Sequence, residues 1–183
     1  MFETVIRKSS AALVLLLFVF VVASSVYVFD PSSSWNELIA SSHVPAPEFQ
    51  PAMGVDEIYD FFSAFNDENR SVYFYYEGFV DVLFFVSIFA FSMGLLGLAL
   101  QRNPSLASRF QWALYIPVAL FFFEVLEGSS LLLVMSLVPD RFELLLWVSD
   151  VATAGKMATY AMVALLNILG VLILIYGFVR DRK

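Results

Sequence analysis

Four ionisable residues lie within long apolar stretches of the sequence, namely Asp81, Glu124, Glu127 and Lys156. A charge at the centre of a bilayer costs about 2.5–3.5 kcal/mol on insertion scales, so it is rare there unless it is paired, solvated or functional. Carboxylates and an amine placed together can form ion pairs, relay protons or hold a cation. The sequence therefore predicts a polar site inside a membrane.

The composition supports a membrane protein and excludes several kinds of site. The chain of 183 residues is 60% hydrophobic with a mean hydropathy of +0.80, whereas soluble domains are about 45–50% apolar. It has no Cys and one His, His43, so we expect no disulfide, no metal centre and no cofactor. The net charge of −7 argues against nucleic acid as a partner, because nucleic-acid binding usually requires a basic surface.

Four long stretches contain most of the excess of hydrophobic residues, at about 11–29, 72–100, 110–138 and 144–179. Each has the roughly 20 apolar residues that a helix needs to cross the ~30 Å hydrocarbon core. No repeat divides the chain. We therefore expect an all-α membrane protein, a four-helix transmembrane bundle in which 1–183 form a single membrane domain.

The first stretch has two interpretations. Arg7 and Lys8 precede it and small residues follow at 23–25, as in a cleaved signal peptide. However, the apolar run is longer than the usual ~7–15 residues of such a signal. We therefore favour an uncleaved anchor.

The Lys and Arg residues outside the spans predict the orientation. One side of a four-span bundle would carry Arg7, Lys8, Arg102, Arg109, Arg180, Arg182 and Lys183. The other side would carry only Arg70 and Arg141. Because basic residues accumulate on the cytoplasmic side, we expect an inner (plasma) membrane protein with both termini in the cytoplasm.

The acidic segment 30–71 would then be an extracytoplasmic loop. Its first half is rich in Pro and Ser and is typical of an irregular loop. Its second half has apolar residues at helical spacing, including Val55, Ile58 and Phe62, which predicts a short amphipathic helix. This helix could lie on the membrane surface or over the mouth of the bundle, or it could pack within an ordinary outer cap.

The ionisable groups of three spans are expected at a similar depth. Asp81, Glu127 and Lys156 each lie about ten to twelve residues from the outer end of their span. With a rise of ~1.5 Å per residue, all three would lie roughly 15–18 Å below the outer surface.

The polar residues of each span also share a helical face, because they are three or four positions apart. These pairs are Glu77 with Asp81, Glu124 with Glu127, and Thr153 with Lys156. We expect the three faces to meet in the interior of the bundle and form the polar or ligand-binding core.

The charges of this core do not balance. Asp81, Glu124 and Glu127 supply three carboxyl groups against the single amine of Lys156. The site would then be hydrated, hold protonated carboxyl groups or bind a cation. The alternative is a structural pair between Lys156 and one carboxylate, which fixes the helix register.

These motifs resemble a group of uncharacterised bacterial four-span integral membrane proteins. That group has acidic residues in span two, a D-x-x-E-N motif in span three and a T-x-x-K motif in span four. The counterparts here are Glu77 and Asp81, the stretch 124–128, and Thr153 with Lys156. Glu124 replaces the Asp and Gly128 replaces the Asn. The resemblance implies the four-span layout over roughly 55–176, and no particular activity.

Three functional hypotheses follow. The leading one is an internal polar pocket that binds a small polar or cationic ligand or relays protons. The second is a non-catalytic subunit whose polar residues pair with another protein or with a second copy of the chain. The third is an intramembrane enzyme acting on a lipid with a carboxylate as acid and base, although no Ser–His pair or phosphate-binding loop supports it. The lipid bilayer is a partner in each case.

The orientation can be tested by labelling. Cysteines introduced at Ser32 and Ser105 of the Cys-free chain should differ in their reaction with an impermeant thiol reagent on intact cells. We expect Ser32→Cys to be labelled and Ser105→Cys to stay unlabelled, because the basic residues place residue 105 inside. Labelling of Ser105→Cys from outside would contradict the four-span topology.

Overall fold

The computed structural model describes residues 2–42, 47 and 54–180, and in this part of the chain every regular element is a helix. His43 and most of the other residues between positions 42 and 54 lie outside the described residues. The elements in chain order are α1 (Phe2–Lys8), α2 (Ala11–Val28), α3 (Ser34–Ser42), α4 (Val55–Ser63), α5 (Asp67–Tyr75), η2 (Tyr76–Asp81), α6 (Val82–Gln101), α7 (Pro104–Phe110), η3 (Gln111–Leu114), α8 (Tyr115–Leu137) and α9 (Glu143–Arg180).

Four helical stretches are long and apolar enough to cross a membrane. They are α2, the run Asp67–Gln101, the run Pro104–Leu137, and α9. The four predicted spans are therefore confirmed as long apolar helices, and the last three extend beyond the predicted limits. With 38 residues, α9 alone is about 57 Å long, so it exceeds the thickness of a hydrocarbon core.

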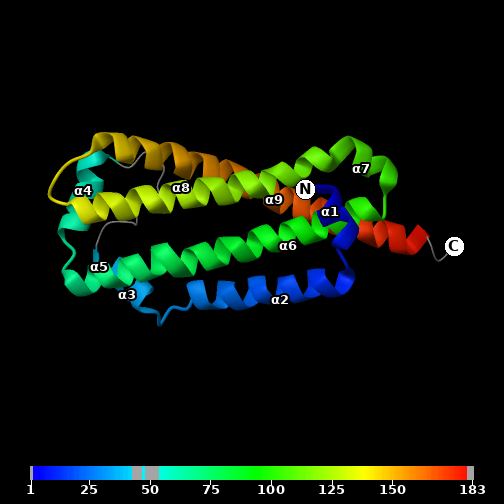
Figure 1. Cartoon of the computed structure of the whole chain (residues 1–183). Coiled ribbons are helices and arrows are strands. Elements are labelled where there is room, and N and C mark those ends of the chain that lie inside the picture. Colours follow the sequence, from blue (N-terminus) through cyan, green and yellow to red (C-terminus); the bar gives the residue numbers. More distant parts are fainter. Residues whose placement is uncertain (1, 43–46, 48–53, 181–183) are drawn as a thin grey trace.

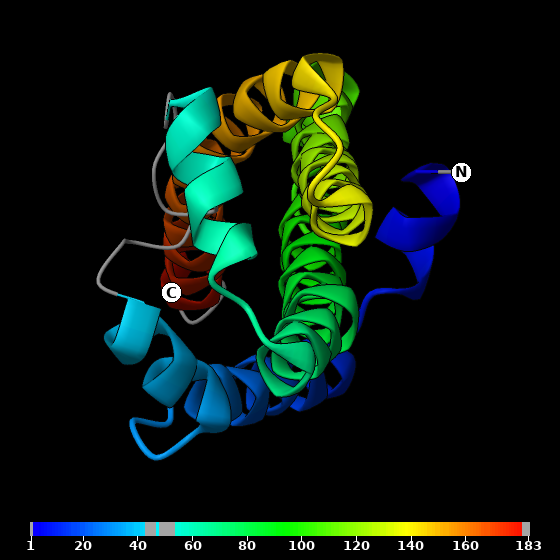
Figure 2. The ribbon, with the colours of Figure 1, turned by 90° about the vertical axis from the view of Figure 1, so that its left-hand side faces the viewer.

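The long helices form an elongated bundle (Figure 1). Helix α8 packs along α9, α2 packs along α6, and α6 also contacts α8 and α9. Both termini lie at one end, together with α1 and α7, whereas α3, α4 and α5 lie at the other end (Figure 1). Viewed from that second end, α2 lies at the edge of the bundle (Figure 2).

The end that carries α3, α4 and α5 is closed by an aromatic core. Ile58, Phe61 and Phe62 of α4 are buried against Tyr73 and against residues of α8 and α9 such as Leu146. Gly54 begins α4, and its N–H donates to the Glu57 carboxylate at 3.1 Å. In the structure, the apolar face of α4 is covered by the bundle itself.

The prediction of an irregular loop before this helix was wrong for residues 34–42, which form α3. Ser33 caps this helix, because its hydroxyl accepts the N–H of Asn36 at 3.3 Å. Asp30 shapes the preceding turn by accepting the Ser32 N–H at 2.9 Å and the Ser32 hydroxyl at 2.8 Å. These two donors hold the pKa of the Asp30 carboxyl below its usual range. The connection between the second and third spans contains a further short helix, α7, with Pro104 in its first turn.

A glycine permits the close approach of α8 and α9. A Cβ at Gly155 would lie 2.6–2.8 Å from ring carbons of Phe123, a separation that atoms do not tolerate. Hydrogen at this position lets the two helices approach closely immediately beside Lys156. The contact therefore helps to set the distance between the polar faces of α8 and α9.

Gly155→Ala should destabilise the bundle by about 1–3 kcal/mol, since overpacking forces the ring or the helices to move. The matched control is Gly177→Ala on the same helix, where an added Cβ meets nothing within 4 Å. That control should be neutral or slightly stabilising, because Ala favours helix over Gly. Thermal unfolding of the detergent-solubilised variants measures both. Equal effects of the two substitutions would contradict the close approach.

Candidate functional site

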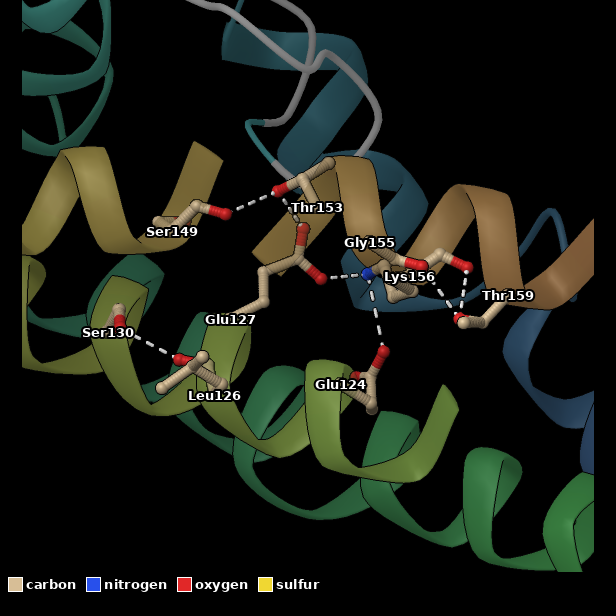
Figure 3. A network of polar contacts seen from close by, with 9 residues as sticks. All are labelled: Glu124, Leu126, Glu127, Ser130, Ser149, Thr153, Gly155, Lys156 and Thr159. Carbon is tan, nitrogen blue, oxygen red and sulfur yellow. Dashed lines mark hydrogen bonds and ion pairs between the residues drawn. The ribbon is translucent and has the colours of Figure 1, made fainter. Parts of the chain in front are cut away.

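Lys156 of α9 lies between two glutamates of α8 (Figure 3). Its Nζ is 3.3 Å from Oε2 of Glu124 and forms a closer ion pair with Oε2 of Glu127. The three residues are 8%, 1% and 0% exposed, respectively. The predicted pairing of Lys156 with a carboxylate is therefore confirmed, and it involves two carboxylates at once.

Thr153 completes this group one turn before Lys156. Its hydroxyl is directed at Oε1 of Glu127 and at the carbonyl oxygen of Ser149, which is 3.0 Å away (Figure 3). Glu127 thus binds Lys156 through one oxygen and Thr153 through the other. This arrangement orients the carboxylate, as expected for a buried charge that is stable only when its oxygens are satisfied.

The second wall of the site comes from an unusual turn of helix. Tyr76–Asp81 form a π-helical segment, η2, within the continuous run from α5 to α6. Such wide turns are rare in proteins, and those that occur often lie at functional sites. Glu77 and Asp81 lie in this turn, and Glu77 is buried. No feature of the sequence predicted the π geometry.

The carboxyl groups of η2 and α8 form a compact cluster. Oxygens of Glu77, Asp81 and Glu124 lie within 4.8 Å of one another. Ionised carboxyl groups this close repel one another, so their proximity favours a shared proton. These three side chains could also hold a metal cation such as Ca²⁺ or Mg²⁺, because such cations prefer oxygen ligands.

The structure increases the predicted charge imbalance. Glu77 adds a fourth carboxyl group, close enough to interact electrostatically with Lys156. The described layer therefore contains four carboxyl groups and one amine in an apolar interior.

Gly128 makes room for one of these carboxylates. A Cβ at this position would lie 3.0 Å from Oε1 of Glu77. Any side chain here would press on the Glu77 carboxylate, so the glycine is linked to the position of Glu77 in this chain.

A cavity of about 370 Å³ adjoins the cluster. Three of its lining residues have acidic or basic side chains, namely Glu77, Asp81 and Lys156. The others are mostly aromatic or aliphatic and come from α2, α3, η2, α6, α9 and the residue after α2: Val28, Phe29, Trp35, Tyr76, Val80, Phe84, Phe85, Met157, Tyr160 and Ala161. Lys156 Nζ lies 5.5 Å from the centre of the Phe85 ring. The cavity thus joins an acidic wall to an aromatic one.

A smaller cavity of about 210 Å³ lies elsewhere along α2, and its lining differs from that of the larger cavity. It is lined by residues such as Phe20, Ser24 and Leu83, and none of its lining residues is charged. The hydroxyl groups of Ser24 and of Ser87 in α6 are hydrogen-bonded there, with 2.9 Å between their oxygens. This second cavity has packing side chains and no group that would select a ligand by charge.

The structure brings all six predicted site residues into one layer, and it adds features that the sequence did not indicate. Glu77 belongs to the charge balance, from which it was omitted. Trp35 lines the cavity, although its segment was predicted to be an irregular loop. Trp35, Leu38 and Ile39 do follow the capping residue Ser33 at helical spacing, and this was the signal that could have revealed α3.

Removing the amine should destabilise the protein strongly. Lys156→Met leaves two buried carboxylates without their partner, which typically costs about 3–5 kcal/mol. Combining it with Glu127→Gln should recover part of that loss, because one of the unpaired charges is removed.

The control is Arg141→Met, which breaks an exposed ion pair with Asp56 and should cost at most about 1 kcal/mol. Chemical or thermal unfolding of the wild type, Lys156→Met, Glu127→Gln and the double variant gives the coupling free energy between the two residues. Strictly additive losses for Lys156→Met and Glu127→Gln would show that the pair does not stabilise the fold.

The chain has no match in the comparisons with known proteins: no family model, no curated protein and no solved structure is similar to it. Its function must therefore be argued from the polar layer and the adjoining cavity.

Proposed function

We propose that the chain is a multi-pass protein of the inner (plasma) membrane with both termini in the cytoplasm. Four helices of sufficient length and apolarity support this proposal. The residues exposed along α2 and α9 are largely apolar, including Phe20, Leu165 and Ile168, and such surfaces are stable when lipid covers them. The shared position of the two termini (Figure 1) agrees with the orientation that the basic residues predict.

We further propose that the intramembrane cavity binds a small organic cation. The observation that carries this proposal is the 370 Å³ cavity with a surplus of carboxyl groups on one wall and aromatic rings on the others. A cation would interact favourably with the carboxyl groups of Glu77 and Asp81 on the cavity wall. The rings of Trp35 and Phe84 would favour the same ligand, because aromatic faces attract cations by about 0.5–2 kcal/mol each.

The character of the cavity favours an organic cation over a metal ion or an anion. Its volume lies within the ~300–1,000 Å³ typical of small-molecule sites and is far larger than one ion requires. Its lining is predominantly apolar, which suits a ligand with a hydrocarbon body. An anion would be repelled by the neighbouring carboxyl groups, and it would find the amine of Lys156 already paired with Glu124 and Glu127.

Proton relay is a second candidate function, and the proximity of the Asp81 and Glu124 carboxyl groups favours it. A proton held between two carboxyl groups can move from one to the other with little displacement of heavy atoms. Asp81 lines the cavity and Glu124 contacts Lys156. Together these residues form a short path from the cavity to the amine.

The subunit hypothesis has less support. The chain's own glutamates already neutralise Lys156, so its charge requires no partner protein. The enzyme hypothesis rests only on the presence of carboxyl groups near a cavity. Ligand binding therefore accounts best for the cavity, its acidic wall and its aromatic wall together.

Calorimetry with benzyltrimethylammonium tests the proposal on the purified protein in nanodiscs. We expect saturable binding, and we expect none of neopentylbenzene, the uncharged isostere. Asp81→Asn should weaken binding about tenfold, which corresponds to ~1.4 kcal/mol, because it removes one carboxyl group from the cavity wall.

The matched control is Asp140→Asn, which neutralises an exposed acid in the α8–α9 turn and should leave binding unchanged. Equal binding of the cation and its isostere, or no effect of Asp81→Asn, would argue against a cation site. Proton relay would remain if binding is absent while Asp81→Asn alters proton uptake by vesicles.

A further inference from the structure

We infer that the ligand is a cationic amphiphile, an ammonium group on a single alkyl chain, which reaches the cavity sideways from the bilayer between α2 and α9. This inference rests on the proposed function and specifies its ligand class and access route. It depends on where the described residues place the opening of the cavity.

The rim of the cavity is formed by exposed residues of two helices that pack on opposite sides of the bundle. Phe29, directly after α2, is 64% exposed, and Met157 and Tyr160 of α9 are 40% and 44% exposed. Helix α2 packs along α6, whereas α9 packs along α8 and α6, so the lining residues of α2 and α9 face each other across the opening. Figure 2 shows α2 and α9 on separate sides of α6.

The rim on α9 lies at the depth of the hydrocarbon core. Tyr160 is about 25 Å from the Glu143 end of this ~57 Å helix. The exposed residues that follow it, Met162, Leu165 and Ile168, are apolar. Once α9 spans a membrane, lipid chains rather than water cover this surface. On the other side of the rim, Phe29 directly follows the end of α2, so the opening leads to the bilayer near the outer end of that span.

The chemistry of the cavity changes from the rim inward. The rim residues Phe29, Met157 and Ala161 suit an alkyl chain, whereas Glu77 and Asp81 on the inner wall suit an ammonium group. A water-soluble cation would have to cross the apolar rim, whereas an amphiphile can leave its chain in the rim and in the bilayer. A phosphate would bring negative charge next to the carboxyl groups of Glu77 and Asp81.

The test uses electron paramagnetic resonance of a hexadecyltrimethylammonium that carries a nitroxide at the chain end. The full-length protein is reconstituted in phosphatidylcholine vesicles, and the matching nitroxide-labelled hexadecanol serves as the uncharged probe. We expect the cation to show a larger motionally restricted component than the alcohol. Asp81→Asn should abolish this excess, because it removes part of the charge that selects the headgroup.

A bulky residue at the rim tests the access route. Ala161→Trp should reduce the excess restricted component several-fold, whereas the matched control Ala158→Trp, one turn away and not part of the lining, should preserve it. Unfolding temperatures and helical circular dichroism verify that both variants fold, and Ala161→Ser gives a second folded variant that should retain the excess.

The outcomes separate this inference from the proposed function. Equal restricted components for the cation and the alcohol, or equal effects of Ala161→Trp and Ala158→Trp, would overturn the amphiphile inference. If benzyltrimethylammonium still binds in that case, the cavity takes a soluble cation and the proposed function stands. If neither cation binds, both are refuted.

Discussion

An ammonium group buried in an apolar bundle must be neutralised by groups at its own depth, and Lys156 meets this requirement with Glu124 and Glu127. Because desolvated charges are expensive, any slip of α9 along α8 would leave these charges unpaired, at a cost of several kcal/mol. The pair therefore fixes the register of the two most extensively packed helices. The close approach at Gly155 serves the same contact, since it brings the two polar faces within reach of a lysine side chain.

Lys156 is paired with two glutamates, and the layer contains two further carboxyl groups. The π-helical turn of η2 adds Glu77 and Asp81 to the α8 glutamates, and Gly128 makes room for Glu77. Each additional buried carboxyl group increases the cost of desolvation. Glu77 and Asp81 also line a cavity, and the proposed cationic ligand would offset part of that cost.

The packing of the helices divides the molecule into a closed end and an open side. The aromatic core around Phe62 and Tyr73 seals the end that carries α3, α4 and α5. In contrast, α2 is held mainly by α6, with contacts such as the Ser24–Ser87 hydrogen bond. A helix at the edge of a bundle leaves part of the interior accessible from the side, and in the proposed membrane setting this side faces lipid.

The sequence by itself determined the four long helices and the residues of the polar layer. Length and apolarity are local properties, and helical spacing places Glu124 with Glu127, and Thr153 with Lys156, on one face whatever the neighbouring helices do. Equal distance from the span ends also predicted that the lysine and the acids meet. Only the tertiary structure decided which acids bind Lys156, that Glu77 joins them through a π-helical turn, and that Trp35 from a distant helix lines the cavity. These features depend on how the helices pack and rotate against one another. In an apolar bundle, contacts between helices such as Gly155 on Phe123 decide this packing. The spacing of residues within a single helix does not reveal such contacts.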